Sequence, residues 1–321
     1  MNKNMNKETK TIKFPLVTII TPAYNRYDLI EETIVSILSQ DYPNFEYIVI
    51  NDGSTDKTLE VIKKYKDKIK IISHENIGET RTVNRGFDLA NGEIIGVVNS
   101  DDPLLPNAIS TMVNFMVKNP HILVVYPDWI MIDGEGKEIE RINTYEYSYI
   151  NMIRWHHCMP GPGALFRKTL LEKINGRDPK FKYVGDFDFW LRAGLLGSFA
   201  RIPKFLATFR VHKNSASISQ TGVKMSNEHV ALVKKIFSRI NNKELLAIKK
   251  ESFSSAYYIA AVVMGENVPL LKAKYFLLSF FYCPLKHFSE YKNRLVVILG
   301  WIKFKIRANI LIKKILCIKS H

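Results

Sequence analysis

Cysteine is scarce in this chain of 321 residues, which has Cys158, Cys283 and Cys317 at wide spacing and no C-x-x-C pair. An odd number of widely spaced cysteines argues against a framework of structural disulfides and against a cysteine-based zinc site. The pattern is typical of a protein in a reducing compartment, and we expect a cytoplasmic location.

Long apolar runs are also missing. The longest run near the C-terminus covers residues 275–285, well short of the ~18 apolar residues that a membrane-spanning helix needs. The N-terminus, "MNKNMNKETKTIK", is polar and basic and has no apolar core of a secretory signal. We therefore expect neither a spanning helix nor a signal peptide, and we expect residues 1–13 to form a frayed tail.

Negative charge is nearly absent from the last part of the chain. The whole chain has a formal net charge of +15. Residues 267–321 contain eleven Lys or Arg and one acid, Glu290, so they contribute +10 of that total. A basic excess of this kind favours an anionic partner.

Three interpretations of this basic C-terminal extension are open. In the first, which we favour, helices lie on an anionic membrane surface with Trp301 and Phe304 as anchors. In the second, the helices form a cap packed on the rest of the chain. Nucleic acid binding ranks lowest, because no recognition motif accompanies the charge. We therefore expect peripheral contact with the inner face of the cell membrane and no nucleic acid partner.

The sequence does have a regular alternation of strand-like and helix-like segments. Segments rich in β-branched and apolar residues predict strands at 16–21, 46–52, 68–74, 93–100 and 122–128. Amphipathic segments between them predict helices, with Asp28 as the candidate N-cap of the first and Ser54 or Thr55 of the second. This order predicts an α/β fold with a Rossmann-like, mostly parallel sheet flanked by helices. Further along, "DGEGK" predicts a hairpin and "GALFR" a short strand.

Polar residues gather where four of these strands end, in "TPAYNR", "NDGST", "HENIG" and "NSDDP". In open α/β sheets, ligands bind beyond the carboxyl ends of the strands. Asp101 and Asp102 are adjacent and repel each other, so the pair indicates a cation site. The same Asp-Asp-Pro sequence also suits the capped start of a helix. No G-x-G-x-x-G follows the first strand, which argues against a nicotinamide-dependent dehydrogenase.

Four stretches resemble the family 2 glycosyltransferases of GT-A fold: "VTIITPAYNR", "IVINDGSTDKT", "NIGETRTVNRGFDLANGEIIGVVNSDD" and "YVGDFDFWLR". They occur in the family's order within residues 15–219. The resemblance implies an inverting transfer of a hexosyl or N-acetylhexosaminyl group from a nucleotide-diphosphate donor, expected to be a UDP-sugar. It also implies a divalent metal, Mn²⁺ or Mg²⁺, on the diphosphate.

The same resemblance divides the chain into parts. We expect a disordered tail at 1–13 and a GT-A domain at 14–221. Within that domain, residues 14–127 form the nucleotide-sugar-binding half and residues 128–221 the acceptor half. A basic and apolar helical extension follows at 222–321.

The resemblance assigns the paired acids to the donor and its metal. Asp102 is the expected metal ligand, and Asp101 is expected to hold the ribose or sugar hydroxyls of the donor. Many members have an acid where this chain has Asn99, so the division of work between the two acids stays open.

Six more residues are expected to contact the donor: Pro22, Tyr24, Asp52, Asn84, Arg85 and Arg210. Asp52 is expected to accept a hydrogen bond from the nucleotide base. Ordinary packing, a common Asp-Gly turn or a solvated helix face would explain some of the same residues.

In the acceptor half, "GDFDFWLR" matches a family pattern that is often E-D-x-D. Asp186 matches the general base that deprotonates the acceptor hydroxyl, and a single base suffices for an inverting displacement. Gly185 replaces the usual Glu, and Asp188 is expected to be a cap or a structural partner. The stretch "FRVHKNSAS" resembles the R-x-H-x-x-S-x-S ending of the family, which makes His212 a second expected metal ligand.

The leading hypothesis is therefore a metal-dependent enzyme. It would move a sugar from a nucleotide-sugar donor to a saccharide or lipid-linked saccharide acceptor in cell-surface polysaccharide biosynthesis. The alternative is a catalytically silent nucleotide-sugar-binding or scaffold subunit of a glycan assembly complex, which the departures at Asn99 and Gly185 keep open. The loops around Gly161 and Asp186 are expected to shape the acceptor pocket.

Overall fold

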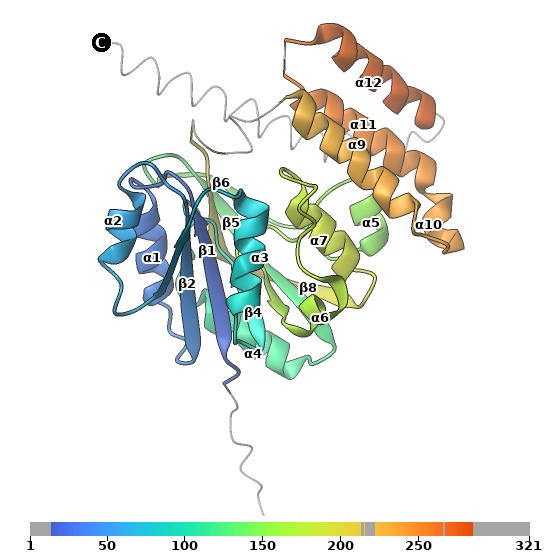
Figure 1. Ribbon diagram of the computed structural model, residues 1–321. Coiled ribbons are helices and arrows are strands. Elements are labelled where there is room, and N and C mark those ends of the chain that lie inside the picture. The colour runs from blue at the N-terminus through green and yellow to red at the C-terminus, as the bar shows by residue number, and fades with distance from the viewer. Residues whose placement is uncertain (1–13, 213–214, 216–221, 266, 285–321) are drawn as a thin grey trace, which may run out of the picture.

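The computed structural model describes residues 14–212, 215, 222–265 and 267–284, and it has an open sheet with helices on both faces (Figure 1). The predicted tail at 1–13 lies outside the described residues, as do Trp301 and Phe304 in the extension.

The sheet joins all the strands of the described residues in the order β3-β2-β1-β4-β7-β5-β6, with β8 paired to β5. The strands are β1 (Val17–Ala23), β2 (Phe45–Asp52), β3 (Lys70–His74), β4 (Ile94–Val97), β5 (Ile122–Ile132), β6 (Glu138–Ile142), β7 (Leu165–Arg167) and β8 (Ser198–Arg210). The first four strands are mutually parallel, and β5 and β8 are parallel to each other. The predicted mostly parallel α/β sheet is confirmed, as are the predicted β5–β6 hairpin and the short strand β7.

The helices fall between and after the strands. They are α1 (Ile30–Leu38), α2 (Thr58–Lys63), α3 (Glu79–Leu89), α4 (Ala108–Lys118), α5 (Tyr149–Arg154), α6 (Thr169–Ile174), α7 (Gly185–Ala193), α9 (Val223–Phe237), α10 (Lys243–Ala247), α11 (Lys249–Val263) and α12 (Pro269–Tyr282). No helix among the described residues is both long and apolar enough to cross a bilayer.

Alternating side chains of the central strands feed two cores, one on each face of the sheet. In β2, Ile48 and Ile50 belong to one core, while Val49 belongs to the other. A strand that is buried on both faces must be apolar throughout, which explains the continuous apolar runs in the sequence.

The antiparallel strand β7 lies between β4 and β5 and interrupts the parallel order. A Cβ atom at Gly96 of β4 would lie 2.5 Å from Leu165 Cδ2 of β7, so a larger residue at this position would require the Leu165 side chain to move. Because β7 returns to the sheet from the second half of the chain, the two predicted halves of the catalytic domain share one sheet.

The predicted helix caps are wrong. Helix α1 begins at Ile30, and no side chain caps it. Ser54 accepts a hydrogen bond from the backbone N–H of Asn25, and Thr55 also bonds to Asn25. Both side chains hold the neighbouring loop after β1 instead of starting α2.

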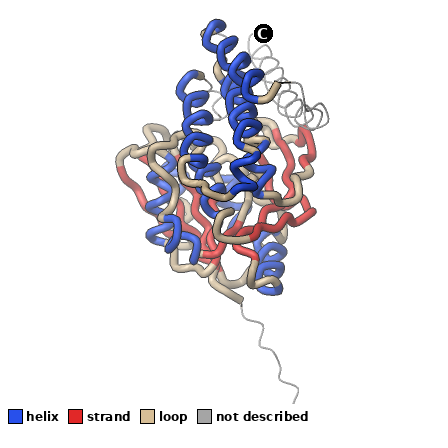
Figure 2. Tube along the Cα trace, turned by 90° about the vertical axis from the view of Figure 1, so that its right-hand side faces the viewer, coloured by secondary structure: helices blue, strands red, loops and turns tan. Residues whose placement is uncertain are grey.

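The described part of the C-terminal extension packs on the catalytic domain (Figures 1 and 2). Apolar side chains of α9 and α11 share one buried core with α5, α7 and the sheet. Ser255 of α11 donates a hydrogen bond to the backbone oxygen of Arg154 in α5. Helices α9 and α11 therefore pack as a helical cap, and α12 packs on α11. Residues 285–321 of the basic stretch lie outside the described residues, so the choice between a membrane surface and a cap for that stretch stays a prediction.

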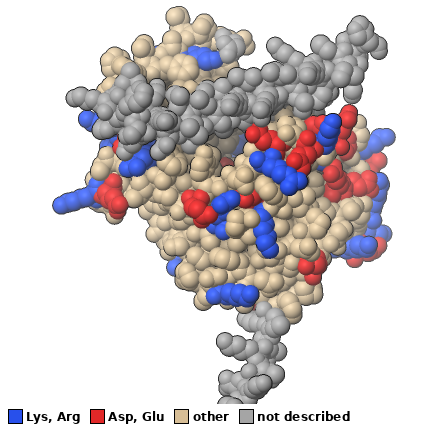
Figure 3. All heavy atoms as spheres, turned by 180° about the vertical axis from the view of Figure 1, so that it is seen from behind, with Lys and Arg blue, Asp and Glu red and all other residues tan. Residues whose placement is uncertain are grey.

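On the face opposite to that of Figure 1, basic and acidic side chains lie beside one another in clusters, with wide uncharged areas between them (Figure 3). The ion pairs of the described residues include those of Arg201 with Asp128 and of Arg141 with Glu138. Mixed charge of this kind contrasts with the single-sign excess in the sequence of residues 267–321.

Candidate active site

The carboxyl ends of β1, β2 and β4 meet at one edge of the sheet, because these strands are parallel and adjacent. This edge carries the loop after β1, Asp52 at the end of β2, and the paired acids just after β4. The end of β8 joins them through Arg210 and His212.

Asp102 is buried, and both of its carboxylate oxygens accept hydrogen bonds from the protein. The backbone N–H of Arg210 donates to Oδ1 at 2.7 Å, and Asn99 Nδ2 donates to Oδ2 at 2.9 Å. Burial raises the pKa of the Asp102 carboxyl, and the charge of Asp101 raises it further. Asn99, the neutral departure from the family pattern, is therefore a hydrogen-bond donor to Asp102.

Asp101 has a different environment from its neighbour. Its Oδ2 lies 2.9 Å from His212 Nε2 and 3.4 Å from Arg26 Nε. Burial alone would raise the pKa of Asp101, but the hydrogen bond with His212 and the charge of Arg26 hold that pKa below its usual value. The structure thus pairs His212 with Asp101, whereas the sequence led us to assign the metal to Asp102 and His212.

Arg210 is buried, and protein oxygens surround its guanidinium group. Nε donates to the backbone oxygen of Asp101, and Nη1 donates to the backbone oxygens of Asp133 and Gly134 in the β5–β6 turn. Nη2 pairs with Glu32 of α1. These contacts favour a role in holding Asp101 over the predicted direct contact with the donor.

The serine of the R-x-H-x-x-S motif holds the end of β8. Ser215 Oγ accepts a hydrogen bond from the backbone N–H of His212 at 3.1 Å and donates to the backbone oxygen of Arg210 at 3.2 Å. Ser215 thereby fixes the backbone of His212, whose side chain lies against Asp101.

Asp52 is buried at the end of β2 and holds the loop that precedes α3. Its Oδ1 accepts from the backbone N–H of Ile77 at 2.8 Å, and its Oδ2 accepts from that of Gly78 at 3.1 Å. His74 Nδ1 lies 3.5 Å from Oδ1. Each oxygen retains a second lone pair, so the predicted contact with a nucleotide base stays a prediction.

The other predicted donor ligands differ in how free they are. Pro22 is buried at the end of β1, and Tyr24 after it is 45% exposed. Arg85 is exposed on α3. Asn84 is held by the backbone of Arg177, which accepts from Asn84 Nδ2 and donates to Asn84 Oδ1, both at 2.8 Å. These contacts favour a structural role for Asn84.

A deep cavity of about 560 Å³ adjoins the strand tips and extends toward α9 and α11. Asp186, in the first turn of α7, lines it and is exposed to it. Glu79 and Arg177 form an ion pair at 3.2 Å and line the same cavity. Gly161 lines it too, so both loops expected to shape the acceptor pocket contribute to one cavity.

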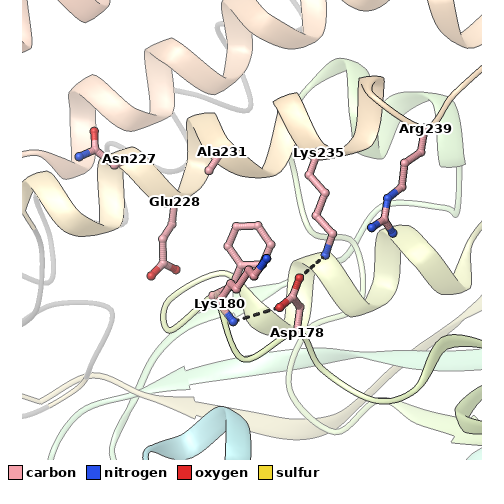
Figure 4. A pocket seen from close by; sticks show the side chains of 8 residues that line it. Asp178, Lys180, Asn227, Glu228, Ala231, Lys235 and Arg239 are labelled. Atoms are coloured by element: carbon pink, nitrogen blue, oxygen red, sulfur yellow. Dashed lines mark hydrogen bonds and ion pairs between the residues drawn. The ribbon is translucent and has the colours of Figure 1, made fainter.

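Helix α9 holds the start of α7, where Asp186 lies. Glu228 of α9 accepts hydrogen bonds from the consecutive backbone N–H groups of Lys182, Tyr183 and Val184, at 3.0, 2.7 and 3.3 Å. Figure 4 shows Glu228 pointing from α9 toward this segment. The carboxylate thereby satisfies donors that precede the first turn of α7.

A second contact between α7 and α9 is made by Asp188, two residues after Asp186 in α7. Asp188 is fully buried and pairs with Lys235 of α9 and with Arg192 of α7. Lys235 also pairs with Asp178 (Figure 4). Asp188 is thus a structural partner, as the sequence led us to expect.

Sequence reasoning did not single out Arg26, Glu79, Arg177, Glu228 or Lys235. Arg26 closes the quoted stretch "TPAYNR", so its position beside a strand tip was a usable signal. The other four residues have no such signal in the sequence, because their partners are distant in sequence and an isolated charged residue is usually solvated.

Asp101 and His212 suit a hard divalent cation. A carboxylate oxygen and an imidazole nitrogen are both ligands of Mn²⁺, and such ions take the rest of their shell from phosphate oxygens and water. Within the part of the chain that the structure describes, no three or more His, Cys, Asp or Glu residues are grouped to hold an ion. The pair therefore fits a cation that is shared with a diphosphate.

Comparison with solved structures identifies the fold. A mannosyltransferase from Pyrobaculum calidifontis, in complex with GDP-Man and Mn²⁺, aligns with a TM-score of 0.60 and 17% identity over 94% of this chain and 86% of that one. TarS residues 1–349 from S. aureus, in complex with UDP-GlcNAc, align with a TM-score of 0.57 and 17% identity over 83% of this chain and 88% of that one. Both neighbours have the GT-A fold, and so does this chain.

Comparison of sequences identifies the family. The family described as Glycosyl transferase family 2 matches residues 18–175. An uncharacterised glycosyltransferase of Rickettsia typhi is 30% identical over 242 residues, which cover 73% of this chain and 76% of the relative. The hyaluronan synthase of Pasteurella multocida is 29% identical over 228 residues, which cover 68% of this chain and 23% of the synthase. The strand-tip acids, the R-x-H-x-x-S-x-S motif that begins at Arg210 and these matches lead to one conclusion: the chain belongs to glycosyltransferase family 2.

Proposed function

We propose that this protein transfers a hexosyl or N-acetylhexosaminyl group, with inversion, from a nucleotide-diphosphate sugar to a saccharide or lipid-linked saccharide. The observation that carries this proposal is the meeting of two unlike sites. The Asp101–His212 pair lies at the strand tips, and Asp186 lines the cavity that adjoins them. The first suits a metal diphosphate and the second suits a hydroxyl acceptor.

The choice of donor and pathway draws on the relatives. The TarS structure contains UDP-GlcNAc, and the curated relatives include hyaluronan and chondroitin synthases. These proteins support a UDP-sugar donor and a place in the synthesis of a cell-surface polysaccharide.

We assign the metal diphosphate to Asp101 and His212, with Arg26 beside them to offset phosphate charge. Mg²⁺ or Mn²⁺ would supply neutralisation of the charge that develops on the departing diphosphate. Asp102 serves as a positioning residue, because its two oxygens fix Arg210 and Asn99. Pro22, Tyr24 and Asp52 surround the nucleotide, and Arg85 is an exposed cation on the neighbouring helix.

Asp186 acts as the general base in this proposal. Its carboxylate takes the proton of the acceptor hydroxyl while the hydroxyl oxygen attacks the anomeric carbon, and the bond to the diphosphate breaks on the opposite side. One base is enough for this single displacement. Glu79 lines the same cavity, but its ion pair with Arg177 engages its carboxylate.

Peripheral contact with an anionic membrane is the remaining part of the proposal. Helix α12 carries Lys272 and Lys274 and no acid. Its outward side chains Leu277 and Phe281 are 57% and 73% exposed. Basic and apolar residues side by side on one helix favour binding to a lipid surface.

A panel of nucleotide sugars, each with and without Mn²⁺, tests the donor assignment by thermal shift of the full chain. A UDP-sugar is expected to raise the melting temperature only when Mn²⁺ is present, because a ligand stabilises the state that binds it. Release of UDP in the presence of a membrane lipid extract then separates an enzyme from a silent scaffold subunit. Equal shifts with every nucleotide, or binding without UDP release, would contradict the proposed function.

A further inference from the structure

The two walls of the deep cavity differ in polarity. The wall from the catalytic domain carries the charged side chains Glu79, Glu140, Arg177 and Asp186. The wall from the extension contains no Lys, Arg, Asp or Glu; it consists of Met225 and His229 of α9 and Ser255, Tyr258, Ile259 and Val262 of α11. All charged side chains of the cavity thus come from the domain side, where they lie among apolar and aromatic side chains such as Trp129, Phe187 and Trp190, whereas the side formed by α9 and α11 has none.

This polarity limits what the cavity can bind favourably. A free saccharide would exchange water for the apolar side chains of α11 and gain little from them. A hydrocarbon group gains about 0.8 kcal/mol for each CH₂ that it buries. The volume of about 560 Å³ lies within the roughly 300–1,000 Å³ of pockets that enclose a ligand with both polar and apolar parts.

We propose that the acceptor is amphiphilic. Its sugar hydroxyl reaches Asp186, and its hydrocarbon chain lies against Tyr258, Ile259 and Val262 of α11. This inference rests on the proposed function for the role of Asp186, and it narrows the acceptor from any saccharide to one that is joined to a hydrocarbon chain.

The cavity wall also continues toward the surface of the molecule. The ring of Tyr258 packs against the ring of Phe276 in α12, with 5.4 Å between the centroids. Phe276 is partly exposed and neighbours the outward side chains Leu277 and Phe280 on the same helix. The apolar wall of the cavity thus adjoins the face of α12 proposed to contact lipid, and the far end of a long hydrocarbon chain would lie on that face.

The basic extension suits the same kind of acceptor. Residues 267–321 carry eleven Lys or Arg and one acid, and α12 itself carries two Lys and no acid. Lipid carriers and the membranes that hold them present phosphate groups, which are attracted to such a region.

Two glycosides that share their sugar test the inference without a donor or a metal. Octyl β-D-glucoside, below its critical micelle concentration, is expected to raise the melting temperature of the full chain and to change its tryptophan fluorescence, because Trp155 lines the cavity. Methyl β-D-glucoside at the same concentration is expected to do neither.

Variants locate the effect. Ile259→Asp and the milder Val262→Ser are expected to weaken the binding of octyl β-D-glucoside, by at least about tenfold for the aspartate. Val35→Asp, at an exposed position of α1 far from the cavity, is the matched control and is expected to bind as the unaltered chain does. Circular dichroism checks that each variant is folded.

Two results would overturn the inference. One is equal stabilisation by the octyl and methyl glucosides. The other is an octyl effect that persists in both folded cavity variants, which would mean binding elsewhere. The thermal shift with UDP-sugar and Mn²⁺ is read separately. A positive donor shift beside a negative octyl result removes only the amphiphilic acceptor, whereas a negative donor shift removes the proposed function.

Discussion

The strand-tip side of the candidate active site could be predicted from the sequence much better than its helical side. At the strand tips, each important side chain belongs to a short motif at the end of a strand, such as "NSDDP" or "FRVHKNSAS". On the helical side, Glu228 and Lys235 of α9 hold the helix that carries the proposed general base, Asp186, and α11 forms a cavity wall. No local pattern marks these residues.

The difference teaches where catalytic precision comes from in this molecule. Backbone turns at the strand ends place the proposed donor ligands, and the chain needs only a few consecutive residues to make these turns. The proposed base and the proposed acceptor cavity depend on tertiary contacts between α7 and α9, a helix that begins 30 residues after α7 ends. Variants on the two sides should therefore fail in different ways.

The largest effect is expected on the acceptor side of the chemistry. Asp186→Asn should lower turnover by a factor of about 10²–10⁴, because positioned base catalysis contributes that much. Donor binding should be unchanged, because Asp186 lines the acceptor cavity. UDP release with a lipid extract measures the first, and the thermal shift with UDP-sugar and Mn²⁺ measures the second. Glu79→Gln is the matched control. If Glu79→Gln lost turnover and Asp186→Asn kept it, Glu79 would be the base instead of Asp186.

The next effect separates the two acids at the strand tip. Asp101→Asn is expected to abolish Mn²⁺-dependent binding of UDP. Asp102→Asn should weaken it by about 10–100-fold, as is usual for a group that orients a metal ligand. Isothermal titration with and without Mn²⁺ measures both. The reverse ranking would restore the assignment of the metal to Asp102 that the sequence led us to make.

On the helical side, Lys235→Met should chiefly affect stability. It leaves Arg192 as the remaining cation partner of the fully buried Asp188 among the described residues, and the free energy of unfolding should fall by about 3 kcal/mol. Lys234→Met, at an exposed position of the same helix, should change it by less than about 0.5 kcal/mol. Urea unfolding measures both changes in the free energy of unfolding. Equal effects of the two substitutions would contradict a stabilising role for the contact between Lys235 and Asp188.

The smallest effect is a pH dependence of stability at the cavity wall. Burial lowers the pKa of His157 to about 4, below the usual value of 6.5. The unfolded chain therefore binds a proton that the folded chain does not, so stability falls as the pH falls from about 6.5 toward 4. His157→Phe should reduce this fall in urea unfolding between pH 7.5 and 5, whereas a change at the exposed His121 should not. If the loss of stability at low pH were the same in His157→Phe as in the unaltered chain, it would be assigned to other groups, such as His156.

Much of the fold followed from the sequence because its cause is local. Strands buried on both faces must be apolar, and the alternation of strand and helix requires parallel pairing. The pairing of the antiparallel strand β7 with β4 could not be predicted from the sequence. It brings together segments that are distant in sequence, and the absence of a side chain at Gly96 leaves room for Leu165 of β7.

The site divides in the same way. The sequence pattern was enough to propose Asp101, Asp186 and His212 as site residues, but the pairing of His212 with Asp101 needed the structure. The saturated guanidinium of Arg210 and the backbone contacts of Asn84 show why a motif alone overstates the number of ligands. Asn99, an anomaly in the sequence, became intelligible once its amide was seen to bind Asp102.

The contact between Lys235 and Asp188 also bears on how the protein is made. The lysine comes 47 residues after the aspartate, which at about 5–20 residues per second takes the ribosome roughly 2–9 s to add. During that interval the strand-tip motifs up to His212 are complete first, while α7 still awaits the cation and carboxylate of α9. The proposed general base, Asp186, is therefore among the last parts of the candidate active site to be set during synthesis, and a nascent chain that bound the proposed donor early would not yet be ready to transfer its sugar.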